Sequence, residues 1–421
     1  MSQTEPQSNN AQRVLLSMCV IIAVIQLGFG AVVPVLPLYA KSFDVSASAI
    51  GATIAAYGLA RMISALPSGG LCDWLGRRPT LLIGGVVSAL GNLGCVVARN
   101  YPEFLVARFA SGFGAGLVLT AGAIVLADIS PARRRGRNMA TYNGVFLFAV
   151  GIGPWPGGLL AEHFGLSAPF AVYAVASLLA GIIAWLAVPE TRTVSAAASA
   201  SAGESASASA NSIELRRSSA DVPKQSFLQQ IRLLSGNTGF MLICLFGLIN
   251  AVVRTGGMFN VVPVLADAKL GLTTSQIGGG LALGSILGLL ASYPAGALSD
   301  RVGRKPVIVP SAFLTAAALL AFCFAPSFGW FVVASLFWGV AASINGAGPA
   351  AYVSDIAPAG MNAAAMSQYR VLSDLGYVVG PIFLGLLADQ QGPEVTLVVA
   401  AAMVAAIGLL FARYAPETHR R

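Results

Sequence analysis

The stretch Gly69-Gly70-Leu71-Cys72-Asp73-Trp74-Leu75-Gly76-Arg77-Arg78-Pro79 is short, charged and rich in glycine. It recurs as Gly296-Ala297-Leu298-Ser299-Asp300-Arg301-Val302-Gly303-Arg304-Lys305-Pro306. The two copies are 300 − 73 = 227 positions apart, and each lies between two apolar segments of membrane-spanning length. A polar loop that occurs twice between such segments indicates a duplicated membrane protein and is hard to explain in a soluble one.

The composition of the whole chain favours the same class. Of its 421 residues, 56% are hydrophobic and 10% are charged, whereas soluble domains are about 25% charged. The net charge of +8 is spread over loops rather than one face, so we expect no nucleic-acid partner. A spanning helix needs about 20 apolar residues. Twelve stretches qualify, at 14–39, 48–69, 79–98, 103–127, 138–161, 168–188, 239–266, 275–297, 306–325, 328–353, 362–387 and 394–413.

The internal repeat extends far beyond the loop. Four further pairs have the 227-residue spacing: Asp128 and Asp355, Tyr142 and Tyr369, Gly153-Pro154 and Gly380-Pro381, and Pro189-Glu190-Thr191 and Pro416-Glu417-Thr418. Near the start of each half the spacing is 229, which relates Pro34 to Pro263 and is explained by a two-residue difference in loop length. We therefore predict an all-α membrane protein made of two six-helix bundles in the same orientation, an arrangement known from transporters.

The predicted bundles are residues 1–190 and 238–421, joined by a linker at 191–237. The linker contains a run, 196–212, that is almost entirely Ala, Ser and Gly and offers little surface to bury. We expect a flexible cytoplasmic tether there, with regulation or partner docking as the alternative.

The loop charges predict the orientation of the chain. With the N-terminus inside, the inner loops and termini hold 18 Lys and Arg residues, and the outer loops hold only Lys41, Arg99 and Lys269. The positive-inside rule then places both termini in the cytoplasm. We expect a monomeric, multi-pass protein of the cell membrane with the repeated loops on its cytoplasmic side.

Repeat and motifs together resemble the major facilitator superfamily over nearly all of residues 14–415. The stretch 69–78 is similar to its signature loop between helices 2 and 3, with Trp74 in place of the first basic residue. The resemblance implies a breakable charged latch that closes the cytoplasmic side when the protein faces outward. The expected latch residues are Gly69, Asp73, Gly76, Arg77, Arg78, Asp128, Asp300, Gly303, Arg304 and Asp355. We expect Asp73 to pair with Arg77 and to cap a helix start. The alternative is that these charges only anchor loops at lipid headgroups.

Two more stretches resemble motifs of the superfamily. Arg108-Phe109-Ala110-Ser111-Gly112 is similar to the helix-4 motif, whose arginine is associated with proton coupling. The segment 151–158 is similar to the helix-5 motif of drug–proton antiporters, which it matches at Gly153, Pro154, Gly157 and Gly158. A Gly-Pro kink there would let helix 5 pack on a helix of the other half and close the path against leaks. A generic membrane kink is the alternative.

Residues that differ between the halves are the candidates for function. The deep charged residues without a charged counterpart in the other half are Arg61, Arg108, Arg254, Arg370 and Asp374. Such groups cost about 2.5–3.5 kcal/mol each in a membrane helix, so they are functional by default. Asp374 lies near the middle of helix 11, with Arg370 one turn away on the same face. Asp374 either carries a proton or forms a permanent ion pair. Many proton-coupled exporters that this chain resembles carry an acid in helix 1, and helix 1 has none here. The resemblance therefore directs proton coupling to Arg108 and Asp374, with Arg370 as a further candidate.

A central cavity should be lined by polar and aromatic side chains of the inner helices. The candidates are Gln26, Phe29, Arg61, Phe146, Asn250, Arg254, Phe259, Asn345 and Tyr369. For any single one of them, plain core packing is the alternative.

The predicted function is a secondary transporter, not an enzyme, that exports small hydrophobic or amphiphilic compounds in exchange for protons. Its partners would be the substrate, protons and the bilayer. The proton gradient would supply the energy without a cofactor, and neither a metal-ligand cluster nor a Gly-x-x-x-x-Gly-Lys loop occurs in the sequence. The alternatives are an exporter or symporter of a specific metabolite, sugar or siderophore, and a non-transporting membrane sensor or scaffold.

Overall fold

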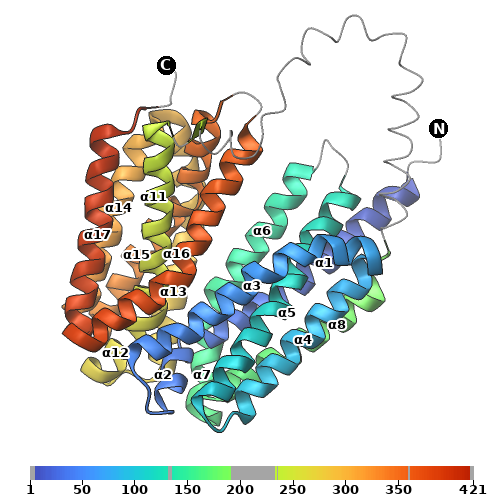
Figure 1. Cartoon of the computed structure of the whole chain (residues 1–421), viewed down its shortest axis with the longest axis horizontal. Helices are drawn as coiled ribbons and strands as arrows, with labels where there is room; N and C mark the ends of the chain where they lie inside the picture. The colour runs from blue at the N-terminus through green and yellow to red at the C-terminus, as the bar shows by residue number, and fades with distance from the viewer. Residues whose placement is uncertain (1–4, 131–134, 191–232, 235, 359–360, 418–421) are drawn as a thin grey trace, which may run out of the picture.

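The structure is a computed structural model that describes residues 5–130, 135–190, 233–234, 236–358 and 361–417. Within these ranges the chain is helical apart from its connecting turns, and twelve segments are long and apolar enough to cross a membrane (Figure 1). The predicted all-α fold with twelve spans is thereby confirmed.

The N-terminal half supplies six of the spans. Its helices are α1 (Glu5–Val32), α2 (Leu36–Lys41), α3 (Ala47–Leu75), α4 (Arg77–Val97), α5 (Tyr101–Ile129), α6 (Arg135–Ile152), α7 (Pro154–Phe164) and α8 (Ala168–Ala187). Side chains satisfy the free N–H groups where helices begin: Ser46 accepts from the N–H of Ala49 at the start of α3, and Asn100 accepts from that of Glu103 at the start of α5. The fifth span consists of α6 and α7, which are separated at Gly153-Pro154.

The C-terminal half repeats this arrangement with one difference. Its helices are α11 (Thr238–Val252), the π-helix η3 (Val253–Val261), α12 (Val262–Leu270), α13 (Thr274–Val302), α14 (Lys305–Cys323), α15 (Phe328–Ile356), α16 (Asn362–Gln391) and α17 (Pro393–Tyr414). The matching stretch of the first half is a regular α-helix, so the π-helix, which the sequence analysis did not predict, distinguishes the two halves. Single π-helical segments inside membrane helices are frequent at functional sites.

The first span ends earlier than predicted. The sequence predicted one segment over 14–39, but α1 ends at Val32 and a turn over 33–35 precedes the short helix α2. Pro34 explains the break, because a proline has no N–H to continue the helix and restricts the residue before it.

Each half buries its own apolar core. In the first half Tyr39, Phe104 and Phe170 pack with ring centroids 5.1–5.8 Å apart, and in the second half Phe411 packs on Phe246 and Tyr352. The two halves therefore form separate bundles. The linker predicted at 191–237 lies outside the described residues except for 233–234 and 236–237, and its boundaries stay a prediction.

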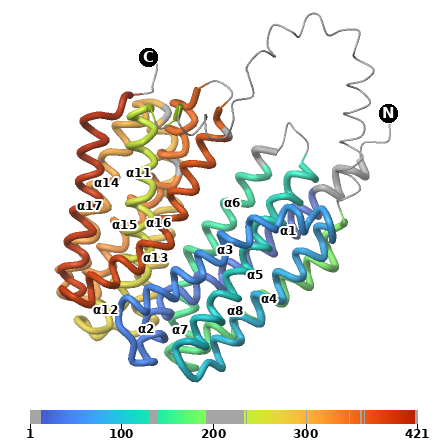
Figure 2. Tube along the Cα trace, viewed as in Figure 1, coloured from blue at the N-terminus to red at the C-terminus, as the bar shows by residue number. Residues whose placement is uncertain are grey.

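The bundles meet at one end and separate at the other. We call the end where α1 begins and α17 ends the terminal face, and the other end the opposite face. In Figure 2 the blue-to-green bundle and the yellow-to-red bundle lie close at α2, α7 and α12 and diverge towards the terminal face. The interface at the opposite face and the helix ends at the terminal face are the two regions that position the candidate site.

Candidate functional site: a central cavity closed at one face

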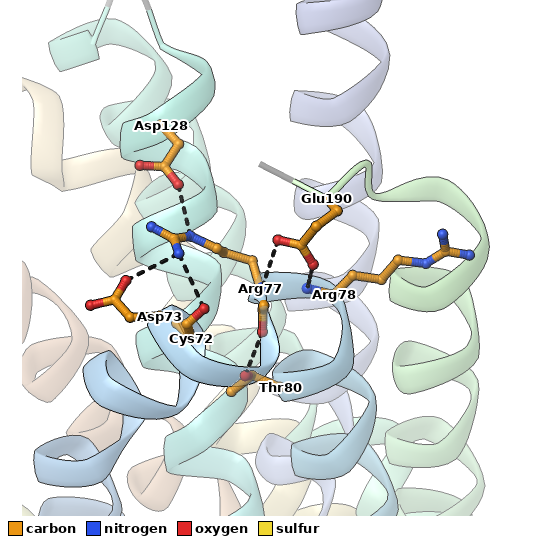
Figure 3. Close-up of polar contacts among 8 residues, drawn as sticks. Cys72, Asp73, Arg77, Arg78, Thr80, Asp128 and Glu190 are labelled. Carbon is orange, nitrogen blue, oxygen red and sulfur yellow. Dashed lines mark hydrogen bonds and ion pairs between the residues drawn. The ribbon is translucent and has the colours of Figure 1, made fainter. Parts of the chain in front are cut away.

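At the terminal face of the first bundle, Arg77 holds three helix ends together. Its guanidinium Nε donates to Asp128 at the end of α5 (3.1 Å), and Nη1 donates to Asp73 and to the carbonyl of Cys72 at the end of α3 (3.1 Å each; Figure 3). The Arg77 side chain is 5% exposed, so this ion pair lies largely out of water. The predicted pairing of Asp73, Arg77 and Asp128 is present in the structure.

The carboxylate that caps the next helix is not the expected one. Glu190 accepts from the backbone N–H groups of Arg77 (3.0 Å) and Arg78 (3.2 Å) at the start of α4, whereas Asp73 was expected to cap a helix (Figure 3). A carboxylate there satisfies free N–H groups and meets the positive end of the helix dipole. Arg78 does not join the ion pairs, because its guanidinium carbon lies 4.4 Å from the centroid of the Trp185 ring.

The second bundle repeats the cluster. Arg304 Nε donates to Asp355 (2.9 Å), and Glu417 accepts from the N–H groups of Arg304 (3.1 Å) and Lys305 (3.2 Å). The side chain of Asp300 lies outside what the structure describes. Gly303 has a φ of 104° and its counterpart Gly76 a φ of 103°, a conformation that favours glycine. The repeated Pro-Glu-Thr segments, to which the sequence analysis gave no role, thus supply the helix caps.

At the opposite face two glycines bring the bundles into close contact. A Cβ on Gly51 of α3 would overlap the carbonyl oxygen of Pro381 on α16, and a Cβ on Gly278 of α13 would overlap that of Pro154 on α7. Both members of the first pair are 227 positions from those of the second, so the same contact is made twice. The Gly-Pro kink of helix 5 therefore lies against a helix of the other half, as the helix-5 motif predicted.

The other glycines of the helix-5 motif also lie at tight packing sites. Gly153 contacts Gly30 of α1, Gly157 contacts Ala31, and Gly158 contacts the backbone of Thr274 on α13. Only hydrogen atoms fit in these positions, so helix 5 packs against both α1 and the second bundle.

Two carboxylates reinforce the contact at the opposite face by capping helices of the other bundle. Asp389 of α16 accepts from the N–H groups of Ala47 (2.6 Å) and Ser48 (3.0 Å) at the start of α3. Its counterpart, Glu162 of α7, accepts hydrogen bonds from Ser275 and Thr273 at the start of α13. Lys41 also pairs with Asp267 across the interface, at 3.7 Å. These contacts close the opposite face.

Between the bundles lies a cavity of about 310 Å³. All nine residues predicted from the sequence line it: Gln26, Phe29, Arg61, Phe146, Asn250, Arg254, Phe259, Asn345 and Tyr369. Its wall includes helices of both bundles, and these helices diverge towards the terminal face (Figure 1). At that face Gly69, Gly70 and Gly296 of α3 and α13 have open space beside them. A chamber between two bundles, closed at one end, can hold a small molecule and exclude it from one side of a membrane.

The family comparison agrees with this architecture. The sequence profile of the Major Facilitator Superfamily matches residues 18–288 and 245–421. The chain belongs to the Major Facilitator Superfamily. Superfamily members are transporters, and the predicted family is thereby confirmed.

Individual relatives of this superfamily member differ in how much of the chain they match. An uncharacterised transporter of Methanocaldococcus jannaschii is 23% identical over 87% of this chain and 89% of its own length. Quinolone resistance protein NorA of Staphylococcus aureus is 32% identical, over 34% of this chain and 36% of its own. The crystal structure of a D-xylose–proton symporter has a TM-score of 0.73 at 18% identity and covers 96% of this chain and 99% of that one, which shows a shared fold.

The three residues predicted for proton coupling in this superfamily member lie in different surroundings. Asp374 lines the cavity with its side chain 37% exposed, and its Oδ2 is 4.0 Å from Nε of Arg370, which is 84% exposed. The carboxylate is therefore accessible rather than deeply buried as expected. Arg108 is 1% exposed and lies within the first bundle, with its guanidinium 4.6 Å from the centroid of the Tyr57 ring.

Sequence analysis missed several cavity residues of this transporter. The aromatic ones are Tyr57, Phe246, Trp338 and Tyr377. Helical spacing could have found two of them, because Tyr57 lies four residues before Arg61 and Tyr377 three residues after Asp374, on the same helix faces.

Proposed function

We propose that this protein exports small amphiphilic compounds across the cell membrane in exchange for protons. The observation that carries the proposal is the central cavity, which is shared by both bundles, closed at the opposite face and lined by Asp374. An alternating-access transporter needs a site of this kind that opens to one side at a time. The partial similarity to NorA supports export over uptake.

The excess of Lys and Arg in the loops on the side of the termini supports a cytoplasmic terminal face. With that orientation, the cavity described here is open to the cytoplasm, from which an exporter takes its substrate. The outward-facing state then requires the contacts at the opposite face to break and the terminal ends of the bundles to come together.

The clusters around Arg77 and Arg304 would contribute to the outward-facing state, in which the terminal face is closed. Each joins helix ends within one bundle and is intact while the terminal face is open. We therefore assign them to holding the ends of α3 and α13 rigid, so that Gly69 and Gly296, which have open space here, pack across the interface when the terminal face closes.

Asp374 is the residue we assign to proton exchange. It is the only carboxylate among the described residues that line the cavity, and its side chain is 37% exposed with Arg370 at 4.0 Å. Because the carboxylate faces the cavity, it is within reach of water on the side to which the cavity opens.

Flux measurements test the proposal. Inverted vesicles that contain the protein should accumulate a lipophilic dye only when their interior is acidic, and collapse of the pH gradient should abolish the accumulation. Asp374→Asn should retain dye binding and lose the response to the gradient, whereas Arg413→Gln, at an exposed position on α17, should behave like wild type. Accumulation that persists without a gradient would exclude proton exchange.

The same vesicles distinguish the alternatives. Polar side chains such as Gln26, Asn250 and Asn345 line the cavity and would suit a polar metabolite carried by symport. Symport predicts proton-driven uptake in right-side-out vesicles and none in inverted ones. A sensor or scaffold predicts no flux in either orientation.

A further inference from the structure

Two arginines from different bundles line the central cavity, each near the middle of its membrane span. Arg61 is the 15th of the 29 residues of its span, and Arg254 is the 17th of 33. Both line the same cavity, one on α3 and one on the π-helix η3. Neither has a charged counterpart in the other half, so the duplicated fold does not require them.

Within the described residues neither guanidinium makes an ion pair with a carboxylate. Arg61 lies over the ring of Tyr377 with its guanidinium carbon 5.0 Å from the centroid, and Arg254 lies over Phe259 at 5.7 Å. Asp374, the one carboxylate in the described cavity wall, is next to Arg370 instead. A structural arginine inside a membrane normally pairs with an acid or with backbone carbonyls. Among the described residues neither guanidinium has a hydrogen-bond acceptor, and both belong to the cavity wall.

The surrounding groups increase the positive potential. Arg61 and Arg254 carry like charges on the wall of one cavity, and Tyr377, over which Arg61 lies, belongs to the same wall. Behind the wall formed by Tyr57 lies the buried Arg108, two of whose guanidinium nitrogens, Nε and Nη1, have no hydrogen-bond partner in the part of the chain that the structure describes. Like charges in a low dielectric repel each other strongly, and an anion between them relieves the repulsion.

We infer that the cavity binds organic anions, with an acidic group of the substrate held between Arg61 and Arg254 and an aromatic or apolar body against the ring walls. Guanidinium groups match carboxylate and phosphonate oxygens in planar, two-point hydrogen bonds. Phe29 stacks on Tyr57 at 5.3 Å, and Phe146 and Trp338 add further apolar surface. The volume of about 310 Å³ suits one small molecule with a fused ring system.

This inference rests on the proposed transport function, because it assigns a negative charge to the compound that the protein would transport. It narrows the predicted class of amphiphilic compounds to those with an acidic group. A cation of the same shape would meet the positive potential of the arginines and be rejected.

Three probes that share one aromatic body test the inference: 2-naphthylacetate, its methyl ester and 2-(2-naphthyl)ethylamine. Their dissociation constants are measured by titration calorimetry on the full chain in detergent, with chloride as the buffer anion because it carries no carboxylate that could compete with the acid. The acid should bind about tenfold or more tightly than the ester and the amine, because hydrogen bonds to ionised groups contribute more than neutral ones.

Variants of the two arginines test whether these residues cause the preference for the acid over the ester and the amine. Arg61→Gln and Arg254→Gln should each weaken binding of the acid about tenfold while the ester changes less than threefold, and Arg61→Lys should retain part of the preference. Arg413→Gln is the matched control on the outside of the second bundle and should retain all of it. The melting temperature of each variant without ligand reports whether it is folded, and if Arg61→Gln does not fold, Arg61→Lys and Arg254→Gln decide.

Three results would overturn the inference: equal or tighter binding of the ester or amine, an acid preference that survives in the double variant Arg61→Gln/Arg254→Gln, or no binding of any probe. The dye-flux assay separates this failure from failure of the proposed function. Gradient-driven flux without an acid preference retains the transporter and rejects the anion site. An acid preference without gradient-driven flux retains the anion site and rejects proton exchange.

Discussion

The helix ends at the terminal face and the wall of the central cavity differ in how similar the two halves of the chain are. Around Arg77 and Arg304 the two bundles repeat one ion pair, at 3.1 and 2.9 Å, and the helix caps, whose distances agree within 0.1 Å. Nη1 differs, because it donates to Asp73 and the Cys72 carbonyl in one bundle and to the Ser299 hydroxyl in the other. In the cavity the halves supply different side chains, such as Arg61 from one and Asp374 from the other. The ion pair and the caps at the helix ends are the same in both copies. Most groups that face the cavity differ, and Tyr369, which corresponds to Tyr142, is an exception.

The largest expected effect compares how much Arg77 and Arg304 each contribute to the free energy of unfolding. Arg77→Ala should lower the free energy of unfolding by about 3 kcal/mol, because it leaves Asp128 largely buried without its cation. Arg304→Ala should cost about half as much, since the Arg304 side chain is 20% exposed and Asp355 is 37% exposed. Denaturation of the purified protein in mixed micelles measures both, and equal losses would contradict the dependence on burial.

The next effect concerns the paired glycines at the opposite face. Gly51→Ala and Gly278→Ala each place a methyl group against a carbonyl oxygen of the other bundle, which should destabilise the closed opposite face by about 1–3 kcal/mol. The population should then shift towards the state with a closed terminal face. Spin-label distances between Leu66 and Val371 should shorten in both variants. The control is Gly144→Ala, where open space surrounds the glycine.

A smaller effect is expected from the carboxylates that cap across the interface. Asp389→Asn and Glu162→Gln should each shift the same equilibrium by about 1 kcal/mol, because the caps of α3 and α13 lose their charge. The two variants should be additive, since they lie in separate contacts. An increase in the Ser42–Gln391 distance measures the opening. If the Ser42–Gln391 distance increases in only one of the two variants, the two caps contribute unequally to closing the opposite face.

The smallest expected effect concerns Arg78, because its contact differs from that of its counterpart Lys305. Its cation–π contact with Trp185 has no equivalent at Lys305, whose ammonium donates to the carbonyl of Ala415 instead. Arg78→Gln should therefore cost about 0.5–1 kcal/mol. Trp185→Leu should cost about 0.5–1 kcal/mol less in the Arg78→Gln background than in the wild type, and a thermal-shift double-mutant cycle checks that difference.

Much of the candidate site could be predicted because a charged residue is easily recognised in the sequence of an apolar helix. Arg61, Arg254 and Asp374 stand out in hydrophobic spans, and the repeat shows that none has a charged counterpart. Glu190 and Asp389 could not be predicted in the same way. Both lie at the polar ends of helices, where acids are common, and only packing decides which helix start each one caps.

The sequence by itself determined the twelve spans, the duplication and the set of charged residues that one half has and the other lacks. These properties follow from hydropathy and spacing, which are local along the chain. Only the tertiary structure decided that Arg61 and Arg254, 193 positions apart, face one cavity, and that Asp389 and Glu162 close the opposite face. Such contacts depend on the rotation of each helix about its axis and on the glycines that let backbones touch, and both are set by packing between distant parts of the chain.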